Sequence, residues 1–306
     1  MTVIVTGASG FLGTALVSKL LAKGHRVYGL SRHPPEAREN LISLKGDILE
    51  PNLGLSEVPE DIDAIYHLAA IHRLGEDKDG SIWVTNVDGT QNVVDFCVKH
   101  DIPHLYFTST AYTQGRNTYE QSKAFCETIV NESSIPKVTI FKPSIIMGTP
   151  QHFYPGHFSQ FISLVIKVHQ WADTARRKLE GTLRLPIIEP VFRMKANPKG
   201  KLNLVAIDDV ARAMAEIDQT GSHWLTHPHP PTLEQLVEWI GEFIMIKIKI
   251  ESDFKPTPIE AAFGKMSTAF VPYLWGDDFP SALKDHSPIT KEFIEQTIRR
   301  TLLNKS

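Results

Sequence analysis

The sequence has few cysteines, no long hydrophobic run and no excess of basic charge. Its two cysteines, Cys97 and Cys126, each fall within a segment whose pattern predicts a helix. We therefore expect two reduced, buried side chains rather than a disulfide or a redox pair. The longest apolar stretch, residues 158–171, contains Lys167 and is shorter than the roughly 20 apolar residues that a membrane-spanning helix needs. These absences argue against a disulfide scaffold and against a membrane protein.

The charge and the N-terminal residues exclude further classes of protein. The formal net charge is −3 at pH 7, which gives no basic field that would attract nucleic acid or an anionic membrane surface. Residues 1–7 contain no basic stretch followed by a long apolar run, so we expect no secretory signal and a cytoplasmic location. A small-molecule partner is the expectation that remains.

In the first half of the chain, short apolar runs alternate with segments of helical periodicity. Strands are predicted at residues 3–5, 27–30, 41–44, 64–67, 105–108 and 138–141, and helices at residues 11–21, 83–98 and 119–130. Strands that are separated by helices predict βαβ units, whose strands run parallel and are covered on both faces. The predicted fold class is therefore α/β, with a Rossmann-type doubly wound parallel sheet.

A glycine-rich loop joins the first predicted strand to the first predicted helix. From Thr6 to Gly13 its spacing is G-x-x-G-x-x-G and not the more usual G-x-G-x-x-G. We expect Gly7 to permit a tight turn, Gly10 to let the backbone approach a pyrophosphate, and Gly13 to let the helix pack closely on the sheet. The helix N-terminus would add N–H groups and a partial positive charge. The candidate phosphate-binding loop also includes Ser9, Phe11 and Leu12.

A glycine loop between the first strand and first helix of a Rossmann-type fold is typical of a site for a nicotinamide dinucleotide. In such a site, the end of the second strand carries the residue that distinguishes NAD from NADP. A carboxylate there would bind the 2′-hydroxyl of NAD, whereas an arginine suits the 2′-phosphate of NADP. The sequence has Ser31-Arg32-His33 at this place and no acidic residue. Arg32 can form charge-assisted hydrogen bonds to a phosphate, with Ser31 and His33 as helpers. We therefore favour NADP(H) as the cofactor; NAD(H), with Arg32 as a solvated surface residue, is the alternative.

The pattern of the chain changes after Gly148. The second half predicts a long helix at residues 157–179, a strand at 202–207, helices at 208–217 and 233–243, and a half-exposed strand at 246–250. We predict that residues 1–148, together with about 202–220, form the NADP-binding Rossmann domain. Residues from about 149–201 and 221–306 would form a smaller, interwoven C-terminal lobe that binds the substrate.

A Tyr-x-x-x-Lys pair begins the helix predicted at residues 119–130. Its spacing places Tyr119 and Lys123 on one face of that helix. A tyrosine has a pKa of about 10 and is a poor base near neutrality, and a neighbouring ammonium group would lower that pKa. Ser109 and Thr110 end the preceding strand, at the carboxyl edge of the sheet where such folds bind ligands. These four residues are the candidate catalytic set.

Several short motifs resemble those of the extended short-chain dehydrogenases/reductases. They are residues 6–13, Gly46-Asp47-Ile48, His67-Leu68-Ala69-Ala70, Asn86-Val87-Asp88-Gly89-Thr90, Ser109-Thr110, Tyr119 with Lys123, Lys142-Pro143-Ser144 and residues 205–210. The resemblance covers most of the chain and implies an NAD(P)-dependent oxidoreductase. Residues 109–112 and 207–209 are more similar to the branch that reduces acyl thioesters or hydrophobic aldehydes and ketones.

The resemblance also implies roles for individual residues. Tyr119 would be the acid/base, and Lys123 would bind the nicotinamide ribose and lower the pKa of the tyrosine. Thr110 would hold the substrate oxygen, with Ser109 as the alternative. The cofactor would further contact Asp47 and Ile48 at the adenine, Ala69 and Ala70 at the pyrophosphate, and Pro143, Ser144 and Ile145 at the nicotinamide.

Three functions remain open at this point. The first is an NADP-dependent oxidoreductase acting on a small or medium, apolar carbonyl or alcohol. The second is a sugar-nucleotide epimerase or dehydratase that retains NAD, against which Arg32 and the short segment between Thr110 and Tyr119 argue. The third is a non-catalytic regulator that senses NADP, against which the intact catalytic set argues. The resemblance also implies a homodimer formed by the helices at 83–98 and 119–130.

Two weaker patterns occur in the second half of the chain. The first is a group of aromatic residues that either line an apolar pocket or belong to an ordinary core: Phe153, Tyr154, Phe158, Phe161 and Trp171. The second is a group of histidines that either bind a metal ion or lie in a polar loop: His223, His227 and His229. Because prolines flank these histidines and no H-E-x-x-H motif is present, we favour the loop and expect no metal.

Overall fold

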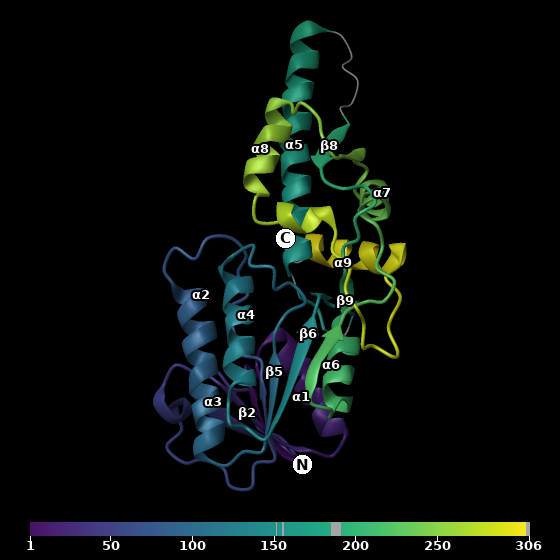
Figure 1. Ribbon diagram of the computed structural model, residues 1–306. Helices are drawn as coiled ribbons and strands as arrows, with labels where there is room; N and C mark the ends of the chain where they lie inside the picture. The colour runs from purple at the N-terminus through teal and green to yellow at the C-terminus, as the bar shows by residue number, and fades with distance from the viewer. Residues whose placement is uncertain (151, 155, 185–190, 304–306) are drawn as a thin grey trace. The chain divides into compact units, whose positions relative to one another are not determined.

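The computed structural model describes residues 1–150, 152–154, 156–184 and 191–303 (Figure 1). The chain forms two compact units, each built from several stretches of sequence. The first comprises Met1–Ile146, Val205–His227 and Phe279–His286, and the second comprises Met147–Leu204, Pro228–Asp278 and the residues from Ser287 onward. Among the described residues, no helix is long and apolar enough to cross a lipid bilayer.

The first unit is built on a seven-stranded sheet in the order β10-β6-β5-β4-β1-β2-β3. Every pair of neighbouring strands is parallel. The strands are β1 (Thr2–Thr6), β2 (Arg26–Ser31), β3 (Leu41–Lys45), β4 (Ala64–His67), β5 (His104–Thr108), β6 (Lys137–Pro143) and β10 (Gly221–Leu225). The α/β, Rossmann-type fold predicted from the sequence is confirmed, and the carboxyl ends of the strands share one edge.

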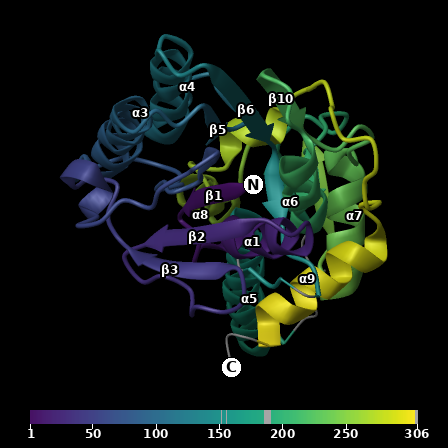
Figure 2. The same ribbon diagram turned by 90° about the horizontal axis from the view of Figure 1, so that it is seen from below.

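Helices cover both faces of this sheet, because successive strand residues point to opposite sides. In β1, Val3 and Val5 pack in the core beneath α1 and α6, whereas Ile4 packs in the core beneath α3 and α4. The two helix pairs lie on opposite sides of the sheet (Figure 2). The helices of this unit are η1 (Pro51–Gly54), α1 (Phe11–Ala22), α2 (Ser81–Trp83), α3 (Gly89–Lys99), α4 (Thr118–Asn131) and α6 (Ile207–Glu216).

The helix predicted at residues 83–98 is interrupted. A π-helical turn, η2 (Val84–Asp88), separates α2 from α3. Within it, the Asn86 carbonyl accepts hydrogen bonds from the Thr90 hydroxyl at 2.6 Å and from the Cys126 thiol at 3.1 Å. Apolar periodicity does not distinguish one π turn from continuous α-helix, and such turns are common at functional sites.

The seventh strand, β10, lies in a segment that we predicted to belong to the C-terminal lobe, whereas in the structure it belongs to the first unit. It pairs with the edge of β6, from Gly221 opposite Thr139 to Leu225 opposite Pro143. Its sequence, Gly-Ser-His-Trp-Leu, has no β-branched residue and is half exposed, so it lacks the pattern of a buried parallel strand. The segment 279–286 also joins this unit, where the Ala282 N–H donates to the Trp224 carbonyl at 2.8 Å.

The second unit has an aromatic core. Phe161 meets Phe263 and Phe270 edge to face, with ring centroids 5.9 and 5.4 Å apart, and β8 and β11 pair in parallel. Its elements are α5 (His157–Leu183), β8 (Phe192–Lys195), α7 (Leu233–Ile244), β11 (Ile248–Glu251), α8 (Pro258–Met266), η3 (Val271–Trp275) and α9 (Lys291–Leu303). Two short strands lie at the boundary in sequence, β7 (Ile145–Met147) and β9 (Leu204–Ala206).

The aromatic residues considered as a pocket or core have different surroundings in the structure. Phe158 is buried and Phe161 belongs to the aromatic core. Trp171 is 47% exposed on α5, with the Lys167 ammonium 5.0 Å from its ring centroid. Phe153 and Tyr154 line a common hollow together with Phe293, Thr297 and Arg300.

Candidate active site

The glycine loop after β1 closes on itself. Gly7 has a φ of +69°, and a Cβ there would lie 2.9 Å from the Ala69 nitrogen. The Gly10 N–H donates to the Gly7 carbonyl over 2.9 Å. A Cβ on Gly13 would lie 2.1 Å from that same carbonyl oxygen. Gly13 thus lets the first turn of α1 lie directly against the backbone of Gly7 and Ala8, which follow β1.

The glycine loop that leads into α1 and the end of β2 are joined by a hydrogen bond. The helix begins at Phe11 after the N-cap Gly10, and first-turn N–H groups have no acceptor within a helix. Ser9 Oγ donates to Ser31 Oγ at 3.0 Å. Arg32 follows Ser31 and is exposed. A helix N-terminus and a guanidinium group therefore belong to the same part of the sheet edge.

Asp47 and Ile48 face different ways after β3. Ile48 is 5% exposed in the core beneath α3, and a Cβ on Gly89 would lie 2.5 Å from its Cδ1 atom. Its carbonyl accepts a hydrogen bond from Asn92 at 2.8 Å. Asp47 is partly exposed, and its carboxylate accepts the Leu49 N–H at 3.0 Å. Of the two side chains, only that of Asp47 is accessible to a ligand.

A buried chain of hydrogen bonds lies beneath the loop. Thr6 Oγ1 accepts the N–H groups of residues 68–69 at 3.2 Å each, so its own hydrogen is directed to His67 Nδ1 at 2.8 Å. His67 Nε2 then donates to Thr90 Oγ1 at 3.1 Å, and the Thr90 hydroxyl donates to the Asn86 carbonyl. Burial lowers the pKa of His67 to about 3. The neutral ring holds the segment after β4 in place.

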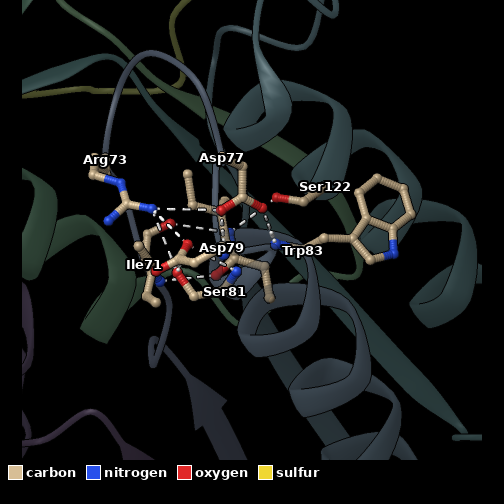
Figure 3. A network of polar contacts seen from close by, with 9 residues as sticks. Ile71, Arg73, Asp77, Asp79, Ser81, Trp83 and Ser122 are labelled. Carbon is tan, nitrogen blue, oxygen red and sulfur yellow. Dashed lines mark hydrogen bonds and ion pairs between the residues drawn. The ribbon is translucent and has the colours of Figure 1, made fainter.

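The residues that follow Ala70 are fastened to α4 and to the start of α2 (Figure 3). The Asn86 side chain bonds both the N–H and the carbonyl of Ile71, at 2.8 and 3.0 Å, and also donates to Ser122 Oγ at 2.9 Å. Asp77 accepts the N–H groups of residues 82–83 at 3.1 Å each. Ion pairs and hydrogen bonds extend this network through Arg73, Asp79 and Ser81.

The start of α4 places Tyr119 in its first turn. Asn117 caps the helix by accepting the Glu120 N–H at 3.0 Å. The Tyr119 hydroxyl is hydrogen-bonded to the Thr110 side chain. Burial raises the pKa of Tyr119 to about 12, the bond with Thr110 opposes this rise, and the charge of Glu120 adds to it. We expected a lowered pKa, but the loss of solvent around the phenol outweighs the stabilisation of its charged form.

Lys123 is buried one turn further along α4. It is 3% exposed, its Nζ donates to the Thr108 carbonyl at 2.7 Å, and it lies 4.8 Å from the centroid of the Phe107 ring. Burial lowers the pKa of Lys123 to about 8, against the opposing charges of Cys126 and Glu127. The Thr108 hydroxyl is buried beside it and has no hydrogen-bond partner among the described residues.

Ser109 and Thr110 have different partners at the end of β5. The Ser109 hydroxyl donates to the Glu127 carboxylate of α4, which also accepts a hydrogen bond from Lys142 Nζ at 2.9 Å. Lys142 lies 4.7 Å from the centroid of the Trp224 ring. Ser109 is thus bound into a buried Ser–Glu–Lys cluster, whereas Thr110 lies beside the tyrosine.

Sequence reasoning missed Glu127 and Lys142. Glu127 follows Lys123 by four residues, so Tyr119, Lys123 and Glu127 form one stripe along α4. That spacing is a signal for Glu127 which we did not use. Nothing in the sequence marks Lys142 as its partner, because the contact joins a helix to a strand.

The end of β6 completes this edge of the sheet. The Pro143 carbonyl accepts the Ala111 N–H at 2.8 Å, and the Ser144 N–H donates to the Leu225 carbonyl at 3.3 Å. Ser144 is buried and Ile145 is partly buried. The candidate residues that follow β1, β2, β3, β4, β5 and β6 therefore all lie at the carboxyl edge of one parallel sheet.

Two of the three histidines considered as a metal site, His223 and His227, have ordinary contacts. His223 contacts the Gln219 carbonyl at 3.0 Å, and the rings of His227 and His286 meet edge to face with centroids 4.7 Å apart. Across the described ranges, no group of His, Cys, Asp and Glu side chains is arranged to hold a metal ion.

Comparison with known proteins identifies the family to which the chain belongs. A family model described as the NAD dependent epimerase/dehydratase family matches residues 3–222. The chain belongs to this family. This family match agrees with the resemblance to NAD(P)-dependent extended short-chain dehydrogenases/reductases that the motifs carry.

Its relatives include reductases and much larger enzymes. The chain is 36% identical to a 2-alkyl-3-oxoalkanoate reductase of Stenotrophomonas maltophilia, over 39% of this chain and 36% of the reductase. It is 28% identical to the hybrid PKS-NRPS synthetase pvhA of Talaromyces variabilis, over 70% of this chain but only 6% of the synthetase. A thiolation-reductase di-domain from an archaeal non-ribosomal peptide synthetase shares its fold, with a TM-score of 0.72, 17% identity, and coverage of 99% of this chain and 75% of that one.

Proposed function

We propose that this family member is an NADP-dependent oxidoreductase that transfers hydride between the nicotinamide and a small or medium, apolar carbonyl or alcohol. The observation that carries the proposal is the placement of Tyr119 beside Thr110, one helical turn from buried Lys123. Carbonyl reduction needs a proton donor, a second hydrogen bond to the reacting oxygen and a nearby cation. These three side chains supply those groups.

The described residues fit a bound dinucleotide. Glycines keep the loop compact, because a Cβ on Gly7 would lie 2.9 Å from the Ala69 nitrogen and one on Gly10 would lie 3.1 Å from the Gly7 oxygen. The N-terminus of α1 suits a pyrophosphate. Lys123 would hold the nicotinamide ribose, and the unpartnered Thr108 hydroxyl offers one more hydrogen bond at the same edge. When bound, the nicotinamide supplies or accepts the hydride. The rest of the cofactor would be lined by Ser9, Phe11, Leu12, Gly13, Arg32, Asp47, the backbone of Ile48, Ala69, Ala70, Pro143, Ser144 and Ile145.

In the reducing direction, Tyr119 would give its hydroxyl proton to the substrate oxygen. We assign the second hydrogen bond to Thr110, because the Ser109 hydroxyl is already bound to Glu127. A pKa of about 12 keeps Tyr119 protonated at neutral pH, which suits a proton donor. The Lys123 ammonium would then stabilise the phenolate that remains. The reductase relative and the fold of the thiolation-reductase di-domain support a carbonyl compound or an acyl thioester as the substrate class.

The cofactor preference is tested by calorimetric titration of the cofactor-free protein with NADPH and with NADH. We expect tighter binding of NADPH, because Arg32 can reach the 2′-phosphate. Arg32→Ala should weaken NADPH binding by about 10- to 100-fold and leave NADH binding unchanged. Arg26→Ala, at the other end of β2, is the matched control. Tighter binding of NADH, or protein that purifies with NAD bound, would overturn the preference and favour the epimerase or dehydratase alternative.

We also propose a homodimer formed through the helices predicted at residues 83–98 and 119–130, which the structure has as the segment from the end of α2 through η2 and α3, and as α4. Trp83 and Phe125 are 37% and 48% exposed, with ring centroids 5.5 Å apart. Exposed aromatic pairs of this kind are typical of interfaces. Light scattering should give the mass of a dimer for the wild type and for Leu49→Glu, a control at another exposed apolar residue, and the mass of a monomer for Phe125→Glu. A wild-type monomer would contradict the proposal.

We also propose a cytoplasmic location. Cys97 and Cys126 are buried and form no disulfide bond, as is usual for proteins of a reducing compartment.

A further inference from the structure

We propose that Glu127 is a positioning residue of this enzyme: its carboxylate keeps Lys123 charged and fastens the ends of β5 and β6 to α4. The inference rests on the proposed function for the role of Lys123 at the cofactor. It concerns a residue that touches neither of the proposed reacting groups. Glu127 acts through Lys123 and Ser109.

The contacts of Glu127 come from the ends of two neighbouring strands. One carboxylate oxygen accepts the Ser109 hydroxyl from the end of β5, and the other accepts Lys142 Nζ from β6 at 2.9 Å. The side chains of Lys142 and Glu127 are 9% and 18% exposed, so the pair is largely shielded from water. A buried carboxylate with two hydrogen-bond donors is held in one position. Glu127 therefore fixes the strand end that carries Thr110.

Lys123 needs a counter-charge because little else around it is negative. From β5 it meets the Thr108 carbonyl and the Phe107 ring. From β4 it faces His67, which is neutral. On α4 itself, Cys126 and Glu127 favour its charged form. Burial raises the pKa of the Cys126 thiol above its usual range, so this group carries no charge at neutral pH and Glu127 is the anion that remains.

Lys142 competes with Lys123 for the same carboxylate. Removing the charge of Glu127 should lower the pKa of Lys123, because an ammonium loses its attraction to an opposite charge. Removing Lys142 should raise the pKa of Lys123, because the carboxylate would be left with one cation instead of two. Ser109→Ala removes a hydrogen bond but no charge, so it should leave this pKa unchanged. The proposal thus predicts three different results from three members of one cluster.

The experiment is an NMR titration of the lysine ammonium signals in the full chain with isotope-labelled lysine. Loss of one signal in Lys123→Met assigns Lys123. We expect Glu127→Gln to lower the pKa of Lys123 by about one unit or more, Lys142→Met to raise it, and Ser109→Ala to leave it in place. If Glu127→Gln does not fold, the opposite shift in Lys142→Met still tests the proposal. No shift in either variant, or an equal shift in Ser109→Ala, would overturn it.

A second measurement separates this inference from the proposed function. The affinity for NADPH should fall as pH rises through the pKa of Lys123, and in Glu127→Gln this fall should begin at a lower pH. If the NMR shifts occur but the affinity shows no such dependence, Glu127 sets the charge of Lys123 and the proposed role of Lys123 at the cofactor is wrong. If the affinity depends on pH in the same way in both proteins, the role of Glu127 is wrong.

Discussion

Two buried threonines on neighbouring strands, Thr108 and Thr139, differ in the hydrogen bonds that their hydroxyl groups form. Thr139 bonds His104 and the Gln219 carbonyl, both at 2.9 Å, whereas the Thr108 hydroxyl has no partner among the described residues. A buried hydroxyl without a partner costs about 1–3 kcal/mol. Thr108→Val should therefore leave the free energy of unfolding unchanged or raise it by about 1 kcal/mol, while Thr139→Val lowers it by about 1–3 kcal/mol. Urea unfolding of both variants checks this, and an equal loss in the two would contradict it.

The residues of the site were predicted better than their electrostatics. Tyr119, Lys123 and Thr110 are adjacent in the structure because a fixed helical spacing and a strand end determine their positions. The direction of the Tyr119 pKa shift could not be predicted, since it depends on how much solvent the surrounding chain removes. The choice between Ser109 and Thr110 depends on Glu127, a contact that forms only after β5 and α4 pack together.

At the scale of the elements, Gly13 tests the packing of the glycine loop. A Cβ there would lie 2.1 Å from the Gly7 oxygen, and that contact can be relieved only by moving the backbone. Gly13→Ala should lower the free energy of unfolding by about 1–3 kcal/mol and weaken dinucleotide binding.

The matched control for Gly13 is another helical glycine. Gly264 in α8 has nothing within 4 Å of an added Cβ. Gly264→Ala should raise the free energy of unfolding by about 0.5–1 kcal/mol, because alanine favours the helix. Thermal and urea unfolding measure both changes. A stabilising Gly13→Ala would mean that the loop relaxes away from α1 without cost.

Strands β1 to β6 were predicted, including β3 at one edge of the sheet, and β10 at the other edge was not. Strands such as β1 and β5 are continuous apolar runs because both faces are covered. An edge strand has one pairing partner and partial exposure, so β10 carries no such run. The π turn at residues 84–88 was missed for a related reason, since its side chains keep nearly the periodicity of the flanking helices.

At the scale of the whole molecule, buried histidines make stability depend on pH. Burial lowers the pKa of His67 to about 3 and that of His104 to about 4, below the unfolded value of about 6.5. The unfolded chain therefore binds more protons between these values, so stability is full above pH 6.5 and declines as the pH falls toward the folded values. For His67 alone, the loss from pH 7 to pH 5 should be about 2 kcal/mol.

Substitution separates this contribution from the rest. His67→Gln keeps one acceptor and one donor but cannot titrate, so we expect lower stability at pH 7 and a shallower decline between pH 7 and pH 5. His33→Gln, at an exposed position, is the control. Urea unfolding at both pH values measures the slopes. An unchanged slope in His67→Gln would show that His67 is not neutral and buried in the folded protein.

The division of the chain between two units has a consequence for biosynthesis. Once the first 146 residues have emerged from the ribosome, six of the seven strands of the sheet are present, and β6 is an unpaired, apolar edge. The strand that covers this edge, β10, is translated only after the whole of α5 and the strands that follow it. Until then the nascent protein presents a template for pairing with other chains. Slow translation between residues 147 and 220 would lengthen that exposure, so the yield of native protein should depend on chaperones that bind during synthesis.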